Sequence, residues 1–175
     1  MNISPSTVVM STAVPALMAV LLIWVSKRGR LILPFATSFV LGGFTSFLLA
    51  LLLSRLLIPV EELLAGESGT VRAGLTNAFL IAALPEELVR LATTIGAVAL
   101  GRRAVGRDVI VTCGMIGLGF AMFENVFYSL TTTAVAEIVI GRTVPAISHG
   151  ASALIMGSLL GPAFSSGRRF LSWPL

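Results

Sequence analysis

Five ionisable side chains of this sequence stand inside long apolar segments. A charged group at the middle of a bilayer costs roughly 2.5–3.5 kcal/mol on insertion scales, so a residue of this kind is a functional-site hypothesis by default. The stretch "LPEELVR", residues 84–90, carries two carboxylates and one guanidinium within a single helical turn. The following two apolar segments add a third carboxylate and the only histidine of the chain. The five residues are Glu86, Glu87, Arg90, Glu124 and His149.

These side chains have the chemistry that hydrolysis of a peptide bond needs. A carboxylate in a low-dielectric cavity can act as a general base toward water near neutral pH. A histidine or a second acid can then protonate the leaving amine or stabilise the oxyanion. The sequence contains no H-E-x-x-H motif and no evident Ser–His–Asp order. Neither a zincin nor a serine mechanism is therefore favoured.

The same residues could also hold a metal ion. Two carboxylates and one imidazole are acceptable ligands for zinc, and the candidate ligands are Glu87, Glu124 and His149. The sequence leaves two alternatives open, which are a divalent metal such as zinc and a centre that uses no cofactor.

Neighbouring residues in the sequence can stabilise the first pair of carboxylates, Glu86 and Glu87. Arg90 lies three residues after Glu87 and four after Glu86, so it can pair with either on a helix surface. Pro85 has no backbone N–H for the carbonyl of Ile81, and we expect the helix to kink or restart there. If it restarts, the two carboxylates lie at a helix N-terminus, where the helix dipole favours their charged form.

Four residues are expected to support the site. Besides Arg90, Phe120 stands one turn before Glu124, and Asn125 follows that glutamate directly. Arg142 lies seven residues before the histidine, and therefore on the same helix face. Each group also has a purely structural interpretation, as an ion pair, a packing histidine or interhelical glue. The coincidence of all of them at comparable depth on three successive segments favours a functional site.

The composition identifies the elements that must position these residues. Hydrophobic residues make up 56% of the 175 residues and charged residues 11%, against about 25% charged in a soluble domain. We therefore predict an all-α, polytopic membrane protein with a single domain over residues 1–175. About 20 apolar residues span the bilayer, and five segments qualify, namely 7–25, 32–54, 76–100, 109–131 and 143–164. The polar segment 59–74 is predicted to be a loop, with a short helix on the membrane surface as the alternative.

The positive charges predict the orientation of the chain. Of twelve basic residues, three lie in linker 26–30, three in linker 101–108 and two in the C-terminal tail. Five crossings put these three regions on one side, and the positive-inside rule makes that side cytoplasmic, with the N-terminus outside. The basic residues are thus topology signals and predict no nucleic-acid partner. We expect a multi-pass protein of the cell membrane in contact with lipid, whose ionisable residues lie in the outer half of the bilayer.

Two of the segments carry faces of small residues that should allow helices to approach closely. They consist of Gly114, Gly117 and Ala121 in the fourth segment and Gly150, Ala153 and Gly157 in the fifth.

The stretches "PEELVR", "GFAMFEN" and "R…SHG" resemble the three motifs of the PrsW family of intramembrane proteases, which is related to the type II CAAX prenyl proteases. The resemblance covers about residues 76–165, the expected catalytic core. It matches Glu86 and Glu87 to the paired glutamates, Arg90 to the basic residue, Phe120 and Glu124 to the second motif, and His149 to the third.

The resemblance implies a glutamate-dependent protease, with metal assistance as an option. Its substrate would be a membrane-anchored protein, such as an anti-sigma factor, cut near the outer face of the bacterial inner membrane. Two alternatives stay open. The carboxylates could serve an ion- or proton-coupled transporter, although we find no internal repeat of the kind transporters have. The same scaffold could also be a non-catalytic membrane chaperone. The sequence does not predict the oligomeric state.

Overall fold

Five helical runs make up the described part of the protein. The computed structural model describes residues 5–26, 32–65, 69–100, 106–131 and 135–171, and all regular secondary structure in these ranges is helical. The first, fourth and fifth runs are single helices. The second and third runs each contain a short π-helical stretch. The elements are α1 (Pro5–Ser26); α2 (Ile32–Thr37), η2 (Ser38–Gly42) and α3 (Gly43–Ala65); α4 (Val71–Thr76), η3 (Asn77–Ala83) and α5 (Leu84–Leu100); α6 (Gly106–Thr131); and α7 (Val135–Leu171).

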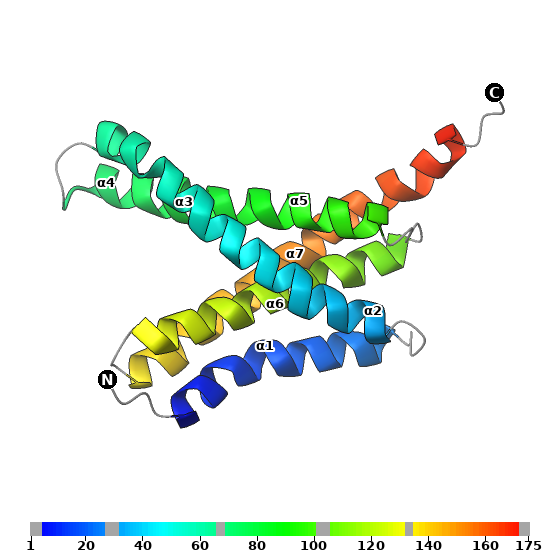
Figure 1. Cartoon of the computed structure of the whole chain (residues 1–175), viewed down its shortest axis with the longest axis horizontal. Coiled ribbons are helices and arrows are strands. Elements are labelled where there is room, and N and C mark those ends of the chain that lie inside the picture. The colour runs from blue at the N-terminus through cyan, green and yellow to red at the C-terminus, as the bar shows by residue number, and fades with distance from the viewer. Residues whose placement is uncertain (1–4, 27–31, 66–68, 101–105, 132–134, 172–175) are drawn as a thin grey trace.

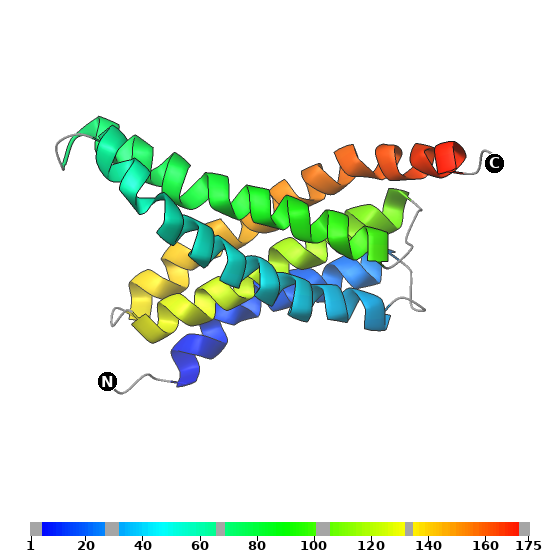
Figure 2. The same ribbon diagram turned by 45° about the horizontal axis from the view of Figure 1, so that its top comes forward.

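The runs are arranged as membrane passes. Figures 1 and 2 show consecutive runs pointing in alternate directions between the same two ends of the bundle. Four helices of the described chain are long and apolar enough to cross a membrane, namely Thr7–Ser26, Ile32–Leu64, Gly106–Thr131 and Gly141–Phe164. The third run is the exception, because every stretch of it long enough to cross a membrane contains at least three charged side chains, among them Glu86 and Glu87. Large apolar side chains such as Trp24 and Leu159 lie on the surface, 76% and 74% exposed, as lipid-facing side chains would.

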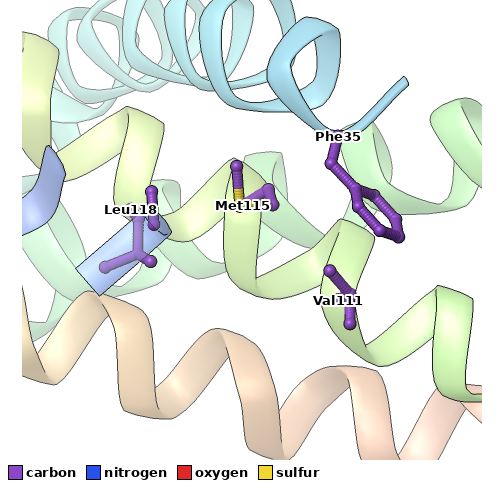
Figure 3. Packing of buried hydrophobic residues seen from close by; sticks show 5 residues of the cluster. Phe35, Val111, Met115 and Leu118 are labelled. Carbon is purple, nitrogen blue, oxygen red and sulfur yellow. The ribbon is translucent and has the colours of Figure 1, made fainter. Parts of the chain in front are cut away.

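Helix α6 is the centre of the bundle, and every residue from 111 to 121 is buried. It packs against α1, α3, α5 and α7. Figure 3 shows Phe35 of α2 beside Val111 and Met115 of α6, with Leu118 further along the same helix. Because this stretch of α6 is enclosed by the other helices, a polar side chain within it is shielded from lipid.

The predicted small-residue faces bring α6 and α7 into close contact. A Cβ atom on Gly117 would lie 2.4 Å from the Cβ of Ala153 and 2.7 Å from the carbonyl oxygen of His149. A Cβ on Gly157 would lie 2.7 Å from the Cα of Ile110. The prediction of close helix approach is confirmed, and the contact lies directly behind the histidine.

Gly119→Ala is expected to destabilise the fold strongly. A Cβ at this position would lie 1.9 Å from the carbonyl oxygen of Phe39 in η2, and backbone atoms can move away only if the helices separate. We expect a loss at or above the upper end of the roughly 1–3 kcal/mol that overpacking usually costs. Thermal unfolding in detergent measures it. The matched control is Gly96→Ala in α5, where no atom lies within 4 Å of the new Cβ. Equal melting temperatures for the two variants would contradict the packing described here.

The prediction of a loop over residues 59–74 was wrong for residues 59–65 and 71–74, which are helical, while residues 66–68 lie outside the described part of the chain. Helix α3 continues through Pro59 to Ala65, and α4 begins at Val71. Pro59 removes only one backbone hydrogen bond, and the good helix formers that follow it allow the helix to continue. Thr70 caps the next helix, because its Oγ1 accepts a hydrogen bond from the N–H of Ala73 at 3.1 Å.

Most of the basic residues on which the topology prediction rests lie outside the described part of the chain. These are Lys27, Arg28 and Arg30, together with Arg102 and Arg103. The orientation in the membrane therefore stays a prediction.

Candidate active site

Helices α5, α6 and α7 bring three of the predicted residues together. Glu86 lies in the first turn of α5, Glu124 near the C-terminal end of α6 and His149 in α7. The Nε2 atom of His149 lies 3.1 Å from Oε2 of Glu124 and 3.9 Å from Oε2 of Glu86. The side chains of Glu124 and His149 are each 11% exposed, and that of Glu86 is 20% exposed. The result is an imidazole between two largely buried carboxylates.

An aromatic ring supports the imidazole from α6. The ring of Phe120 meets that of His149 edge to face, with the centroids 5.0 Å apart. The guanidinium of Arg90 lies over Phe120 at 5.4 Å from the ring centroid. Phe120, predicted as a supporting residue, thus contacts both the guanidinium of α5 and the imidazole of α7.

Helix α5 begins with an altered hydrogen-bond register. The N–H of Leu84 donates to the carbonyl of Phe79, five residues earlier, which closes η3. The expected disturbance at Pro85 is therefore present as a π-helical stretch, a feature often found at functional sites. The chain stays helical through this junction, so Glu86 and Glu87 do not lie at a free helix N-terminus.

Glu87 points to a different environment. Its carboxylate forms an ion pair with Arg90, and its side chain is 42% exposed. It borders an apolar recess formed by Phe79, Leu80, Ala83 and Leu84. Successive residues on an α-helix project about 100° apart, so only one of two adjacent glutamates can face α6 and α7. The set predicted as metal ligands, Glu87 with Glu124 and His149, is therefore not brought together, and Glu86 is the glutamate that lies beside His149.

Arg90 connects α5 to α7 as well as pairing with Glu87. It is 2% exposed. Its Nη1 donates to the carbonyl of His149 at 3.2 Å and to Oγ of Ser152 at 3.1 Å. Its Nε donates to the carbonyl of Glu86 at 3.3 Å. The spacing within one helix predicted the ion pair, but it held no signal for the contacts with α7.

Asn125 and Arg142 form a polar network around Glu124. Arg142 forms an ion pair with Oε2 of Glu124, and its Nε donates to Oδ1 of Asn125 at 3.0 Å. The amide nitrogen of Asn125 in turn donates to the carbonyl of Ser11 in α1 at 2.6 Å. The Arg142 guanidinium also lies 4.3 Å from the ring centroid of Tyr128. Two predicted supporting residues thus touch the site, while sequence reasoning missed Ser11 and Tyr128.

A cavity of about 240 Å³ adjoins the two carboxylates. At about 30 Å³ per molecule in the liquid, this volume holds several waters. Glu86, Glu124 and Ser54 line it, together with four aromatic rings. The rings belong to Phe47, Phe120, Phe127 and Tyr128. The carboxylates therefore meet a space that can hold water beside an apolar wall.

The three clustered residues fit a divalent metal in their chemical type. A carboxylate oxygen and an imidazole nitrogen are both zinc ligands, and bonds of about 2.0 Å place tetrahedral ligand atoms about 3.3 Å apart. The two separations from His149 Nε2, 3.1 and 3.9 Å, lie on either side of that value. Within the described residues, however, no group of three His, Cys, Asp or Glu side chains already forms a metal-binding arrangement. Arg142 holds the Glu124 oxygen that a metal would need.

Comparison with known proteins gives one match. A family model described as PrsW family intramembrane metalloprotease matches residues 32–175. No curated protein and no solved structure matches the chain. The matched range contains all of the clustered residues, and α1 precedes it.

Proposed function

Because the chain belongs to the PrsW family of intramembrane metalloproteases, we propose that Glu86, Glu124 and His149 form the hydrolytic centre of an intramembrane endopeptidase. The observation that carries this proposal is the imidazole between two carboxylates at the wall of a cavity that can hold water. Family membership favours a peptidase over a transporter or a chaperone, because it supplies the reaction that such a cluster would perform.

The proposed roles follow from the partners of each group. Glu86 has no guanidinium bound to its carboxylate in the described contacts, and it faces the cavity. It is placed to accept a proton from water while the water oxygen attacks the scissile carbonyl carbon. When the C–N bond breaks, the proton passes to the leaving amine through Glu86 or His149. Glu124 is bound by Arg142, so its role is to orient the imidazole rather than to act as the base.

A divalent metal would supply Lewis-acid polarisation of the carbonyl and activation of water. Glu86, Glu124 and His149 are the residues that would hold it, in which case Arg142 would release the Glu124 oxygen and a metal-bound Glu86 would not act as the base. Glu87 is bound to Arg90 and is better explained as a partner of that guanidinium.

We further propose a membrane-anchored protein as the substrate, cut near the outer face of the cell membrane. An anti-sigma factor in the bacterial inner membrane is one protein of this type. The distribution of basic residues supports an outside N-terminus and a cytoplasmic C-terminus, and with that orientation the clustered residues would lie in the outer half of the bilayer.

The test is cleavage of a panel of single-span reporter proteins by the purified protein in proteoliposomes. We expect at least one reporter to be cut within or next to its membrane segment, which mass spectrometry of the fragments would show. If a metal takes part, a chelator abolishes cleavage and added Zn²⁺ restores it. A folded protein that cuts no reporter but carries a proton flux dependent on Glu86 would contradict the proposal and favour a transporter.

A further inference from the structure

A hydroxyl group of α3 replaces a backbone donor that is missing from the third helical run. Oγ of Ser54 donates to the carbonyl oxygen of Ile81 at 2.7 Å. In an α-helix this carbonyl would accept from the N–H of residue 85. Residue 85 is a proline and has no N–H. Ser54 is 27 residues away in the sequence, so the replacement comes from a different helix.

The replacement occurs beside the proposed catalytic carboxylate. Ser54, Ile81 and Glu86 all line the same cavity. Ile81 lies in η3, and Glu86 follows five residues later in the first turn of α5. A carbonyl that is shielded from water and lacks a donor costs about 1–3 kcal/mol, and the Ile81 carbonyl is partly buried. The hydroxyl from α3 therefore stabilises the π-helical junction in this place.

A second hydrogen bond joins the same two runs at the beginning of η3. Asn77 donates to Oε1 of Glu61 at 2.9 Å in an exposed position. Asn77 precedes Glu86 by nine residues, and the altered helical register of η3 lies between them. This bond can hold the beginning of η3, but not its end.

We propose that Ser54 is a positioning residue for Glu86. Its hydroxyl fixes the end of η3 against α3, and thereby sets where the first turn of α5 presents the Glu86 carboxylate to His149 and to cavity water. The inference rests on the proposed function. Since a misplacement of about 1 Å can cost roughly 100-fold in rate, a small shift of this junction is enough to lower kcat.

The experiment is a double-mutant cycle on the full-length protein. Ser54→Ala is expected to lower kcat roughly tenfold with little change in KM, as a partial loss of positioning would. Ser54→Thr keeps the hydroxyl and should retain activity. Pro85→Ala supplies the missing N–H, so adding Ser54→Ala to it should change kcat by less than about twofold, a clear departure from additivity. The matched control is Ser158→Ala, whose hydroxyl donates to Ile155 at 2.7 Å on an exposed face of α7.

Hydrogen exchange of residues 77–90 provides a readout that does not depend on activity. Ser54→Ala should increase exchange there, and Ser54→Ala combined with Pro85→Ala should not. Unchanged exchange and unchanged kcat in Ser54→Ala, or an equal loss in Ser158→Ala, would overturn the proposal. If the exchange results appear as expected while the wild-type protein cuts no reporter, the proposed function fails and the role of Ser54 at this junction stands.

Discussion

Replacing Glu86 with glutamine is expected to abolish reporter cleavage, whereas replacing Glu87 with glutamine should leave cleavage within about threefold of wild type. A general base typically contributes 10²- to 10⁴-fold to the rate, and Glu86 is the glutamate of the pair that faces His149 and the cavity. Glutamine at position 87 keeps an amide oxygen that can accept from Arg90. Arg90 also keeps its hydrogen bonds to the carbonyls of Glu86 and His149 and to Ser152, so its buried charge retains polar partners.

The comparison of Glu86→Gln with Glu87→Gln has a built-in control, since both variants make the same chemical change one residue apart. Initial cleavage rates are measured beside melting temperatures, which should be similar for the two proteins. The opposite ranking, with Glu87→Gln inactive and Glu86→Gln active, would assign the base to the glutamate that pairs with Arg90. It would then contradict the geometry of the cluster.

Replacing His149 with phenylalanine is expected to lower cleavage at least about 100-fold, the lower limit for loss of an acid–base group. Phenylalanine has a similar ring and can keep the edge-to-face contact with Phe120. It removes Nε2, which lies 3.1 Å from the Glu124 carboxylate. Glu124 keeps its ion pair with Arg142, so the buried charge retains a partner and the fold should persist.

The control for this substitution is His149→Ala assayed with and without free imidazole. The smaller side chain leaves space beside Phe120, and partial rescue by imidazole would show that the ring nitrogen, and not the packing of the ring, is what cleavage needs. A phenylalanine variant with a near-wild-type rate and melting temperature would exclude the imidazole from the reaction.

The part of the fold that depends on the lengths of the apolar segments was predictable from the sequence. Segments of about 20 apolar residues must form helices in a bilayer, since a backbone without internal hydrogen bonds is too costly there. The small residues of α6 and α7 predicted their close contact, which the position of Gly117 against Ala153 confirms. The error lay at residues 59–65, where polar residues were taken to end a helix that in fact continues. Polarity indicates where apolar surface ends, and it does not determine where helical hydrogen bonding stops.

Part of the candidate site could be predicted, because its ionisable residues are rare among apolar neighbours. The choice between Glu86 and Glu87 could not be predicted. The helical period gives the directions of side chains relative to one another, but not which of them faces α6 and α7. The π-helical stretch η3 further shifts the register just before them. Ser54 and Ser11 could not be found either. Nothing in the local sequence distinguishes either serine, and its importance comes from a carbonyl or an amide on a distant segment.

The most direct test of the hydrolytic centre is the mass of the new carboxyl terminus when a reporter is cleaved in water enriched in ¹⁸O. Wild-type protein is predicted to release a fragment that carries one ¹⁸O atom from solvent, while Glu86→Gln releases none. Labelled fragment at equal rates from both proteins, or no labelled fragment from either folded protein, would contradict the assignment of water activation to Glu86.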